Sequence, residues 1–157
     1  MGDDPTSFSA DSVYSCKQVI KHILDWSGAD FALVQLERKV TGRKPLPIRT
    51  KGEVKISDHL VTIGHASGLP TKISTRGKIR EIYTDYITAS IDTYGGNSGG
   101  AVFNDKTGEV EGILVRGEDD YVRVSKTKAC LVSNVCKDND CQGEDITRIS
   151  AVIPFLP

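Results

Sequence analysis

Short runs of β-favouring residues, each followed by a turn signal, dominate the chain from residue 54 onward. Dipeptides such as Ser67-Gly68, Arg76-Gly77 and Thr84-Asp85 separate many of these runs and favour turns. Strands of this length and spacing are typical of a barrel or a sandwich. The sequence therefore predicts a mostly all-β chain with strands at 54–56, 60–64, 78–83, 86–91, 99–103, 110–115 and 121–124.

The segments on either side of this region carry separate expectations. Apolar residues at helical spacing predict a short amphipathic turn within residues 16–26, whereas 31–36 is typical of a buried strand. Prolines and a glycine in 41–47 indicate a connection between two lobes, which divides the chain into domains 1–45 and 46–157. Acids followed by apolar residues at 144–152 predict a short C-terminal helix that Pro154 ends.

Charge and hydropathy exclude several partners. The 20 Lys and Arg residues nearly balance the 21 Asp and Glu residues, so nothing favours nucleic acid or an anionic membrane surface. No apolar run approaches the roughly 20 residues that span a bilayer. Residues 1–5 lack the basic start and apolar core of a signal peptide, so the export signal of a secreted or periplasmic protein would lie outside this chain.

The four cysteines bear on whether the protein is exported to an oxidising compartment. Their spacing does not match a zinc site, and no histidine lies near the three at the C-terminal end. One or two disulfides in an exported protein is the preferred interpretation, with free buried thiols as the alternative. The sequence does not decide how Cys16, Cys130, Cys136 and Cys141 pair. It also leaves the oligomeric state open.

The sequence Gly-Gly-Asn-Ser-Gly-Gly at 95–100 carries the chemistry. A nucleophilic serine needs a rigid turn with backbone N–H groups aimed at the developing oxyanion. Glycines before Ser98 permit a positive φ and leave the amides accessible, and those after it leave room around the hydroxyl. An ordinary loop is the alternative, because Gly, Asn and Ser are common turn residues.

Four segments resemble the chymotrypsin-like (trypsin-like) serine peptidase family, in the family's order. They are Asp-Phe-Ala-Leu-Val-Gln-Leu at 30–36, Leu-Val-Thr-Ile-Gly-His at 60–65 with Gly-Leu-Pro at 68–70, Gly-Asn-Ser-Gly-Gly-Ala-Val-Phe at 96–103, and Val-Glu-Gly-Ile-Leu-Val-Arg-Gly at 110–117. Asparagine before the serine resembles the bacterial branch that includes glutamyl endopeptidases. The resemblance implies a chymotrypsin-like double β-barrel that acts on a protein or peptide substrate, with no metal or organic cofactor.

The resemblance also implies residue roles. Ser98 would be the nucleophile and Asp30 the carboxylate that supports an imidazolium. The oxyanion hole would consist of the Gly96 and Ser98 amides, with Asn97 packed beneath the turn. A turn acid before a strand is the alternative for Asp30.

The residues implied for substrate binding are more speculative. Asp92 stands six residues before Ser98, at the pocket-floor position, where an acid favours Arg or Lys side chains. A turn aspartate that never meets substrate is the alternative. Residues 114–117 resemble the strand on which substrate backbone lies, with Leu114, Val115 and Gly117 as candidates. Leu114 replaces a histidine of glutamate-specific relatives, which argues against glutamate preference.

The family's catalytic histidine is not found at its expected place. His22 lacks the small-residue context and suits an exposed helix face, and His59 suits a loop. The order Asp30, His65, Ser98 is that of subtilisin-like triads, but a partly buried turn histidine is the preferred interpretation of His65.

We therefore expect a first barrel truncated before its histidine. Loss of that base costs about a million-fold in turnover in a well-studied triad, so the isolated chain should be nearly inactive. A non-catalytic homologue that binds peptides in the substrate groove is one rival. A plain β-barrel module with an accidental glycine turn is the other.

Overall fold

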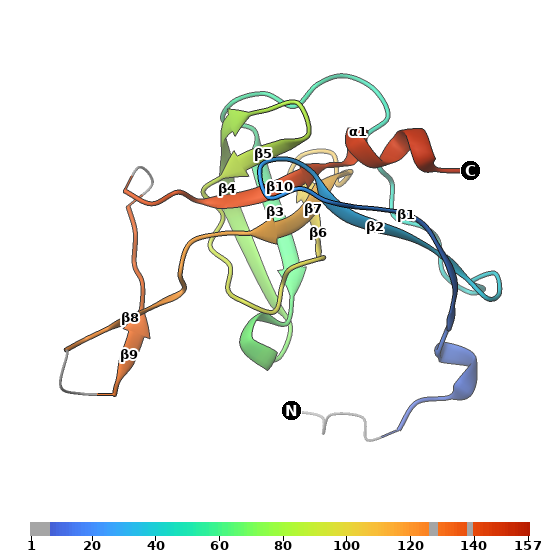
Figure 1. Ribbon diagram of the computed structural model, residues 1–157, viewed down its shortest axis with the longest axis horizontal. Helices are drawn as coiled ribbons and strands as arrows, with labels where there is room; N and C mark the ends of the chain where they lie inside the picture. The colour runs from blue at the N-terminus through green and yellow to red at the C-terminus, as the bar shows by residue number, and fades with distance from the viewer. Residues whose placement is uncertain (1–6, 126–128, 138–139) are drawn as a thin grey trace.

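Within residues 7–125, 129–137 and 140–157, which the computed structural model describes, six antiparallel strands close into a barrel (Figure 1). Their order around the barrel is β10-β5-β4-β3-β6-β7, and every neighbouring pair is antiparallel. The prediction of an all-β fold is confirmed. The strands are β3 (His59–Gly64), β4 (Lys72–Ile82), β5 (Tyr86–Ala89), β6 (Ala101–Asn104), β7 (Val110–Arg116) and β10 (Glu144–Arg148).

Alternation of side chains along these strands fills the barrel. Successive residues of a strand point to opposite faces, so one residue in two is directed inward. In β6 the alternate residues Val102 and Asn104 are buried. The apolar core inside the barrel consists of Val54, Leu60, Ile79, Ile87, Ala89, Ile91, Val102, Leu114 and Ile146.

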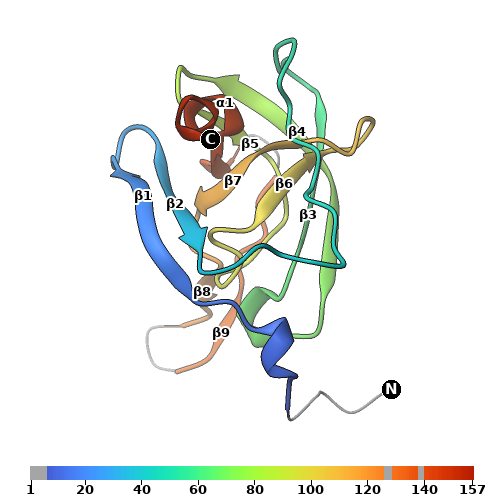
Figure 2. The same ribbon diagram turned by 90° about the vertical axis from the view of Figure 1, so that its right-hand side faces the viewer.

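Two ribbons of two strands project from the barrel. The first pairs β1 (Cys16–Leu24) with β2 (Asp30–Leu36), and the second pairs β8 (Tyr121–Arg123) with β9 (Leu131–Ser133). Figure 1 shows them on opposite sides of the barrel, and Figure 2, turned by 90°, brings the side that carries the first ribbon toward the viewer.

The β1–β2 ribbon packs its loop end against the barrel. Phe31 joins an apolar cluster with Val110 of β7 and with Ile149 and Val152 of the terminal helix α1 (Ile149–Val152). Phe155, in the 3-10 turn Ile153–Phe155, places its ring 6.1 Å from that of Phe31. This second cluster fixes the ribbon on the outside of the barrel.

The prediction of a helical turn within residues 16–26 is wrong, because Cys16–Leu24 forms strand β1. The ladder between β1 and β2 shifts register between Cys16 and Gln18 and again between Val19 and Lys21. Such bulges break the two-residue alternation of a strand. The apolar spacing consequently imitates a helical period.

Other boundaries also differ from expectation. The strand expected at 54–56 is not formed, although Val54 contributes a buried side chain to the core. The C-terminal helix is confirmed but begins only at Ile149, since 144–148 is strand β10. Strand β9 was not predicted. Single 3-10 turns occupy Ala10–Ser12 and Ala66–Gly68.

The segment between the ribbon and the barrel is attached to β7. Ile48 forms a parallel bridge with Val110, and the Arg49 amide donates to the Val110 carbonyl at 3.1 Å. The Arg49 guanidinium donates to both carboxylate oxygens of buried Glu111, at 2.5 and 2.6 Å. This ion pair raises the pKa of Arg49, mainly through its hydrogen bonds to Glu111. The division into domains at residue 45 stays a prediction.

One of the two possible disulfides is present, between Cys136 and Cys141. Cys16 and Cys130 are free and exposed, so the alternative of buried free thiols does not hold for them. No helix in the described part of the chain is long and apolar enough to cross a membrane. The prediction about a signal peptide concerns residues 1–5, which lie outside the described residues.

Candidate active site

Ser98 lies exposed at the tip of the turn that joins β5 to β6. Gly96 has φ +99° and Gly99 has φ +85°, conformations that residues with a Cβ rarely adopt. The turn is closed by hydrogen bonds from the Asn97 amide to the Tyr94 carbonyl and from the Gly100 amide to the Asn97 carbonyl. The local sequence thus accounts for the sharp turn that presents the hydroxyl.

Hydrogen bonds from three directions fix the turn to the barrel. The Gly99 amide donates to the Leu114 carbonyl at 2.7 Å, and the Leu114 amide donates to the Gly100 carbonyl at 3.0 Å. On the other side the Gly95 amide donates to a carboxylate oxygen of Asp120 at 2.7 Å, while its carbonyl accepts from the Ser67 amide at 2.7 Å. The serine is therefore held on a rigid support.

Asn97 lies beneath the turn and is only 8 % exposed. Its side-chain amide donates to the Thr93 hydroxyl at 2.5 Å. Its Oδ1 is buried without a hydrogen-bond partner and faces Gly64, where an added Cβ would come within 2.3 Å of that oxygen. Asn97 and Gly64 are thus packed in direct contact.

The backbone amides of Gly96 and Ser98 donate no hydrogen bond within the described residues. Both residues are exposed, so the two N–H groups are available to an incoming oxygen. The Ser98 hydroxyl likewise has no partner within that part of the chain. A free hydroxyl and free amides on the same turn supply two of the parts that acyl transfer needs, the nucleophile and the donors for the oxyanion.

Asp30 is the first residue of β2 and is half-buried. The Thr147 hydroxyl accepts from the Asp30 amide at 2.9 Å and donates to the Asp30 carbonyl at 3.0 Å. Thr147 itself is 1 % exposed, so this double contact anchors Asp30 to the barrel. Nearby, Arg116 donates to Asp145 at 2.9 Å and to the Gly28 carbonyl at 3.1 Å, which holds the preceding loop.

None of the three histidines, all of which are described, hydrogen-bonds to Asp30 or to Ser98. His22 is exposed on β1 opposite Ala32, a strand position and not the expected helix face. His59 begins β3 and is not a loop residue. His65 is a turn residue as expected but is exposed, with its ring nitrogens near the Leu69 carbonyl (3.2 Å) and the Thr71 hydroxyl (3.4 Å).

Of the four residues suggested for substrate binding, one side chain is buried and the other three residues are exposed or half-buried. Leu114 is 2 % exposed in the barrel core, so its side chain cannot meet substrate, although its backbone holds the nucleophile turn. Half-buried Val115 and exposed Gly117 follow on the same strand and just beyond it. Asp92 is exposed and lines a cavity of about 310 Å³ beside the turn.

The sequence pattern does not reveal Glu144, which also lines that cavity. Burial, followed by the charges of Asp120, Asp145, Asp92 and Glu118, raises the pKa of Glu144 to about 8. The run Glu118-Asp119-Asp120 was the available signal for an acidic site, but only the barrel brings Glu144 next to it. The part of the chain that the structure describes holds no group of three or more His, Cys, Asp or Glu arranged for a metal ion.

The fold is similar to those of solved proteases. The Rv3671c protease of M. tuberculosis, as an inactive Ser343Ala mutant, aligns with TM-score 0.59 and 17 % identity over 94 % of this chain and 65 % of that one. Its active form gives 0.57 and 18 % over 81 % and 52 %, and Deg5 gives 0.54 and 16 % over 87 % and 57 %.

The chain spans about two thirds or less of the length of these structures. At this identity the likeness establishes the fold alone. No curated protein sequence matches the chain. Residues 4–113, more than half of the chain, match the family model described as a trypsin-like peptidase domain. The chain therefore belongs to the trypsin-like peptidase domain family.

Proposed function

We propose that this chain is the nucleophile-bearing part of a serine endopeptidase that cleaves peptides through an acyl-enzyme. The observation that carries the proposal is the rigid Ser98 turn, with its free hydroxyl and the free amides of Gly96 and Ser98. Ser98 attacks the peptide carbonyl, and the two amides stabilise the oxyanion of the tetrahedral intermediate. Asn97 keeps the turn in shape from below.

Asp30 is proposed as the carboxylate that orients a histidine base. Thr147 anchors the backbone amide and carbonyl of Asp30, which supports this role because the carboxylate that supports an imidazolium must be carried by a fixed backbone. None of the three histidines, all of which are described, hydrogen-bonds to Asp30 or Ser98, so the base is proposed to come from strands outside this segment. The exposed apolar residues Val19, Ile20 and Leu24 of β1 offer a surface for such strands.

We also propose that the chain is related to the glutamyl endopeptidase branch and that it comes from an exported bacterial protein. The disulfide between Cys136 and Cys141 supports export, since structural disulfides persist mainly in oxidising compartments. The substrate is proposed to be a protein or peptide.

A non-catalytic homologue that binds peptides in the same groove is the second candidate. It is favoured by one specific observation: none of the three histidines, all of which are described, hydrogen-bonds to Ser98. A binder would present the same groove but would not need a reactive hydroxyl.

Chemical rescue distinguishes the two candidates. A fluorophosphonate probe should label the chain slowly, and added imidazole should accelerate labelling by serving as a diffusible general base. Ser98→Ala should abolish labelling with and without imidazole, whereas Ser67→Ala, which removes another exposed hydroxyl next to the turn, should leave it unchanged. Peptide binding without any Ser98-dependent labelling would favour the non-catalytic homologue.

A further inference from the structure

The β8–β9 ribbon projects from the barrel, and Figure 1 shows it at the left end of the molecule. Among the described residues its two short strands pair with one another and with no strand of the barrel. A two-stranded ribbon on its own is at best marginally stable in water and gains stability when a further surface covers it. The barrel does not supply that surface.

The exposed side chains of the ribbon are largely hydrophobic. Val122 and Val132 lie opposite each other in the ladder and are 41 % and 48 % exposed. The Val124 amide donates to the Cys130 carbonyl at 3.4 Å, and these two residues continue the same face because alternate residues of a strand share a face. The exposed hydrophobic residues of the ribbon and its flanks are Tyr121, Val122, Val124, Leu131, Val132 and Val135. A contiguous set of this kind is typical of an interaction surface.

The charged residues of the ribbon all have one sign. Residues 121–137 contain four Lys or Arg and no Asp or Glu. Two of the four, Lys126 and Lys128, lie outside the described residues. The other two, Arg123 and Lys137, are exposed, and their side chains have no ion-pair or hydrogen-bond partner in the part of the chain that the structure describes. The balanced charge of the whole chain thus conceals a local excess of positive charge.

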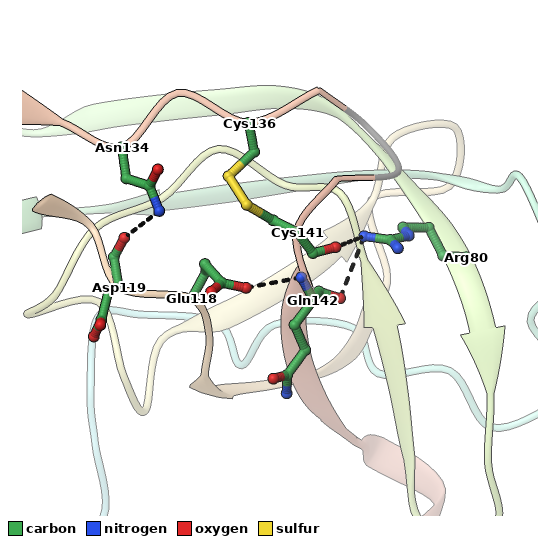
Figure 3. The surroundings of a disulfide bond; sticks show 7 residues. All are labelled: Arg80, Glu118, Asp119, Asn134, Cys136, Cys141 and Gln142. Carbon is green, nitrogen blue, oxygen red and sulfur yellow. Dashed lines mark hydrogen bonds between the residues drawn. A yellow bond between two sulfur atoms is a disulfide. The ribbon is translucent and has the colours of Figure 1, made fainter. Parts of the chain in front are cut away.

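The base of the ribbon is fixed to the rest of the molecule. The Asn134 side chain donates to the Asp119 carbonyl at 2.9 Å, as Figure 3 shows, and the Asn134 backbone amide donates to the Asp120 carbonyl at 2.8 Å. The disulfide between Cys136 and Cys141 follows directly in the chain (Figure 3). The ribbon is therefore held at one end and open to a partner along its strands.

The acids that precede the ribbon are engaged at this base. Glu118 accepts from the Gln142 amide at 2.8 Å, and Asp120 accepts from the Gly95 amide at 2.7 Å (Figure 3 shows the first). Arg123 is three residues beyond Asp120, about 10 Å along an extended strand. That separation exceeds the screening length of about 8 Å in physiological salt. The acids consequently cancel little of the attraction between the strands and an anionic partner.

An anionic lipid surface matches both properties of the ribbon. Its headgroups attract Lys and Arg, each of which strengthens binding by about fivefold near such a surface. Its acyl boundary removes aliphatic side chains from water. Nucleic acid matches less well, because it is bound through basic residues and aromatic platforms, whereas the strands carry mainly aliphatic residues. The aromatic residue Tyr121 already packs its ring 5.6 Å from that of Tyr94.

We propose that the β8–β9 ribbon docks on an anionic lipid surface. The face of Val122, Val124 and Val132 lies at the boundary between headgroups and acyl chains, and Arg123 on the opposite face is then at the depth of the headgroup phosphates. Docking places the Ser98 turn beside the lipid, because Asp120 at the base of the ribbon bonds to that turn. The lipid binding itself does not rest on the proposed endopeptidase function.

Sedimentation with lipid vesicles tests the charge requirement. The chain should bind vesicles of mixed phosphatidylcholine and phosphatidylglycerol much more tightly than vesicles of phosphatidylcholine alone, and added salt should reduce the difference. The double variant Arg123→Gln, Lys137→Gln should lower partition onto the mixed vesicles by about 25-fold, at about fivefold for each residue. Arg43→Gln, Lys44→Gln is the matched control, because it removes one exposed Arg and one exposed Lys from the segment after β2 and should change partition little.

A second pair of variants tests the hydrophobic requirement. Val122→Thr, Val132→Thr keeps the shape and the preference for strand but replaces the hydrophobic pair, and should weaken binding to the mixed vesicles about tenfold. Ile63→Thr, Ile73→Thr is its control, since this exposed pair also lies opposite in a ladder, between β3 and β4 of the barrel. The control should bind like the wild type.

Tryptophan emission shows which ribbon meets the lipid. The single tryptophan of the wild type, Trp26, is exposed in the loop between β1 and β2, so its emission should not shift when mixed vesicles are added. Leu131→Trp in a Trp26→Phe background should shift to shorter wavelength and be quenched by brominated lipid. If the threonine variant of the β8–β9 ribbon does not fold, this emission decides the question.

Several outcomes overturn the docking proposal. They are failure of the wild type to bind mixed vesicles, equal binding by a ribbon variant and its control, and a shift of Trp26 without a shift of Leu131→Trp. Binding to poly-uridylate that needs Arg123 but not Val122 identifies a polyanion site instead of a lipid site. Self-association without vesicles that Val122→Thr, Val132→Thr abolishes identifies a second copy as the partner. Fluorophosphonate labelling of Ser98 is measured without vesicles, so the lipid proposal and the endopeptidase proposal fail separately.

Discussion

Asn97 shows how one side chain beneath the nucleophile depends on a residue more than thirty positions away. Its amide group holds Thr93, while its Oδ1 contacts the backbone of Gly64 on β3 without a hydrogen bond. A buried carbonyl oxygen without a partner is costly, and close packing keeps it in place. The shape of the Ser98 turn is consequently linked to the size of residue 64.

A double-mutant cycle tests this contact. Gly64→Ala should destabilise the wild-type chain by about 1–3 kcal/mol, because the new Cβ displaces Asn97. In an Asn97→Ala background the same change should be close to neutral, since the 2.3 Å clash with Oδ1 is gone. Urea unfolding of the four proteins gives the coupling free energy. An equal cost of Gly64→Ala in both backgrounds would contradict the contact.

At the scale of elements, patterns predicted what is local. The nucleophile turn and most barrel strands were evident from turn residues and β-favouring runs. Strand β1 was not, because its two register shifts disguise the alternation. The pattern also could not show that Glu144 and Asp145 belong to strand β10, which closes the barrel by pairing with both β5 and β7. Nor could it show that the Thr147 hydroxyl hydrogen-bonds to the backbone of Asp30, 117 residues away in the sequence. Such contacts depend on three-dimensional packing alone.

The Thr147 contact decides how firmly the β1–β2 ribbon is held. Thr147→Val keeps the shape but leaves the partly buried amide and carbonyl of Asp30 without their partner, a loss of about 1–3 kcal/mol in unfolding free energy. Hydrogen exchange of the Asp30 amide should accelerate more than that of amides inside the barrel. Thr147→Ser keeps the hydroxyl and should restore most of the protection. Equal exchange in the two variants would show that the hydroxyl does not hold the ribbon.

At the scale of the whole molecule, the barrel is complete, while the β1–β2 ribbon is largely exposed and is buried only near its loop end. Phe31 is buried against the barrel, whereas Val19 and Val34, which pair across the ribbon, are 55 % and 44 % exposed. Single exposed apolar residues are common, but a paired set on an open strand ribbon favours association. The same molecule gathers five acids around one cavity, so its near-zero net charge conceals strong local repulsion.

That repulsion should make the stability of the whole chain depend on pH through Glu144. Its pKa rises from an ordinary value near 4.5 to about 8 on folding, so the folded chain binds this proton more tightly than the unfolded chain. The resulting stabilisation is fully present below about pH 4.5 and is lost as the pH rises through about 8. Asp25, whose pKa is lowered mainly by hydrogen bonds from Ser27, acts only in more acidic solution and does not offset this loss.

The melting temperature should therefore fall between about pH 5 and about pH 9 in the wild type and in the control Asp85→Asn, and should fall much less in Glu144→Gln. A wild-type melting temperature that rises over this range, or an equal fall in Glu144→Gln, would mean that Glu144 is not held in the acidic cavity as the structure places it.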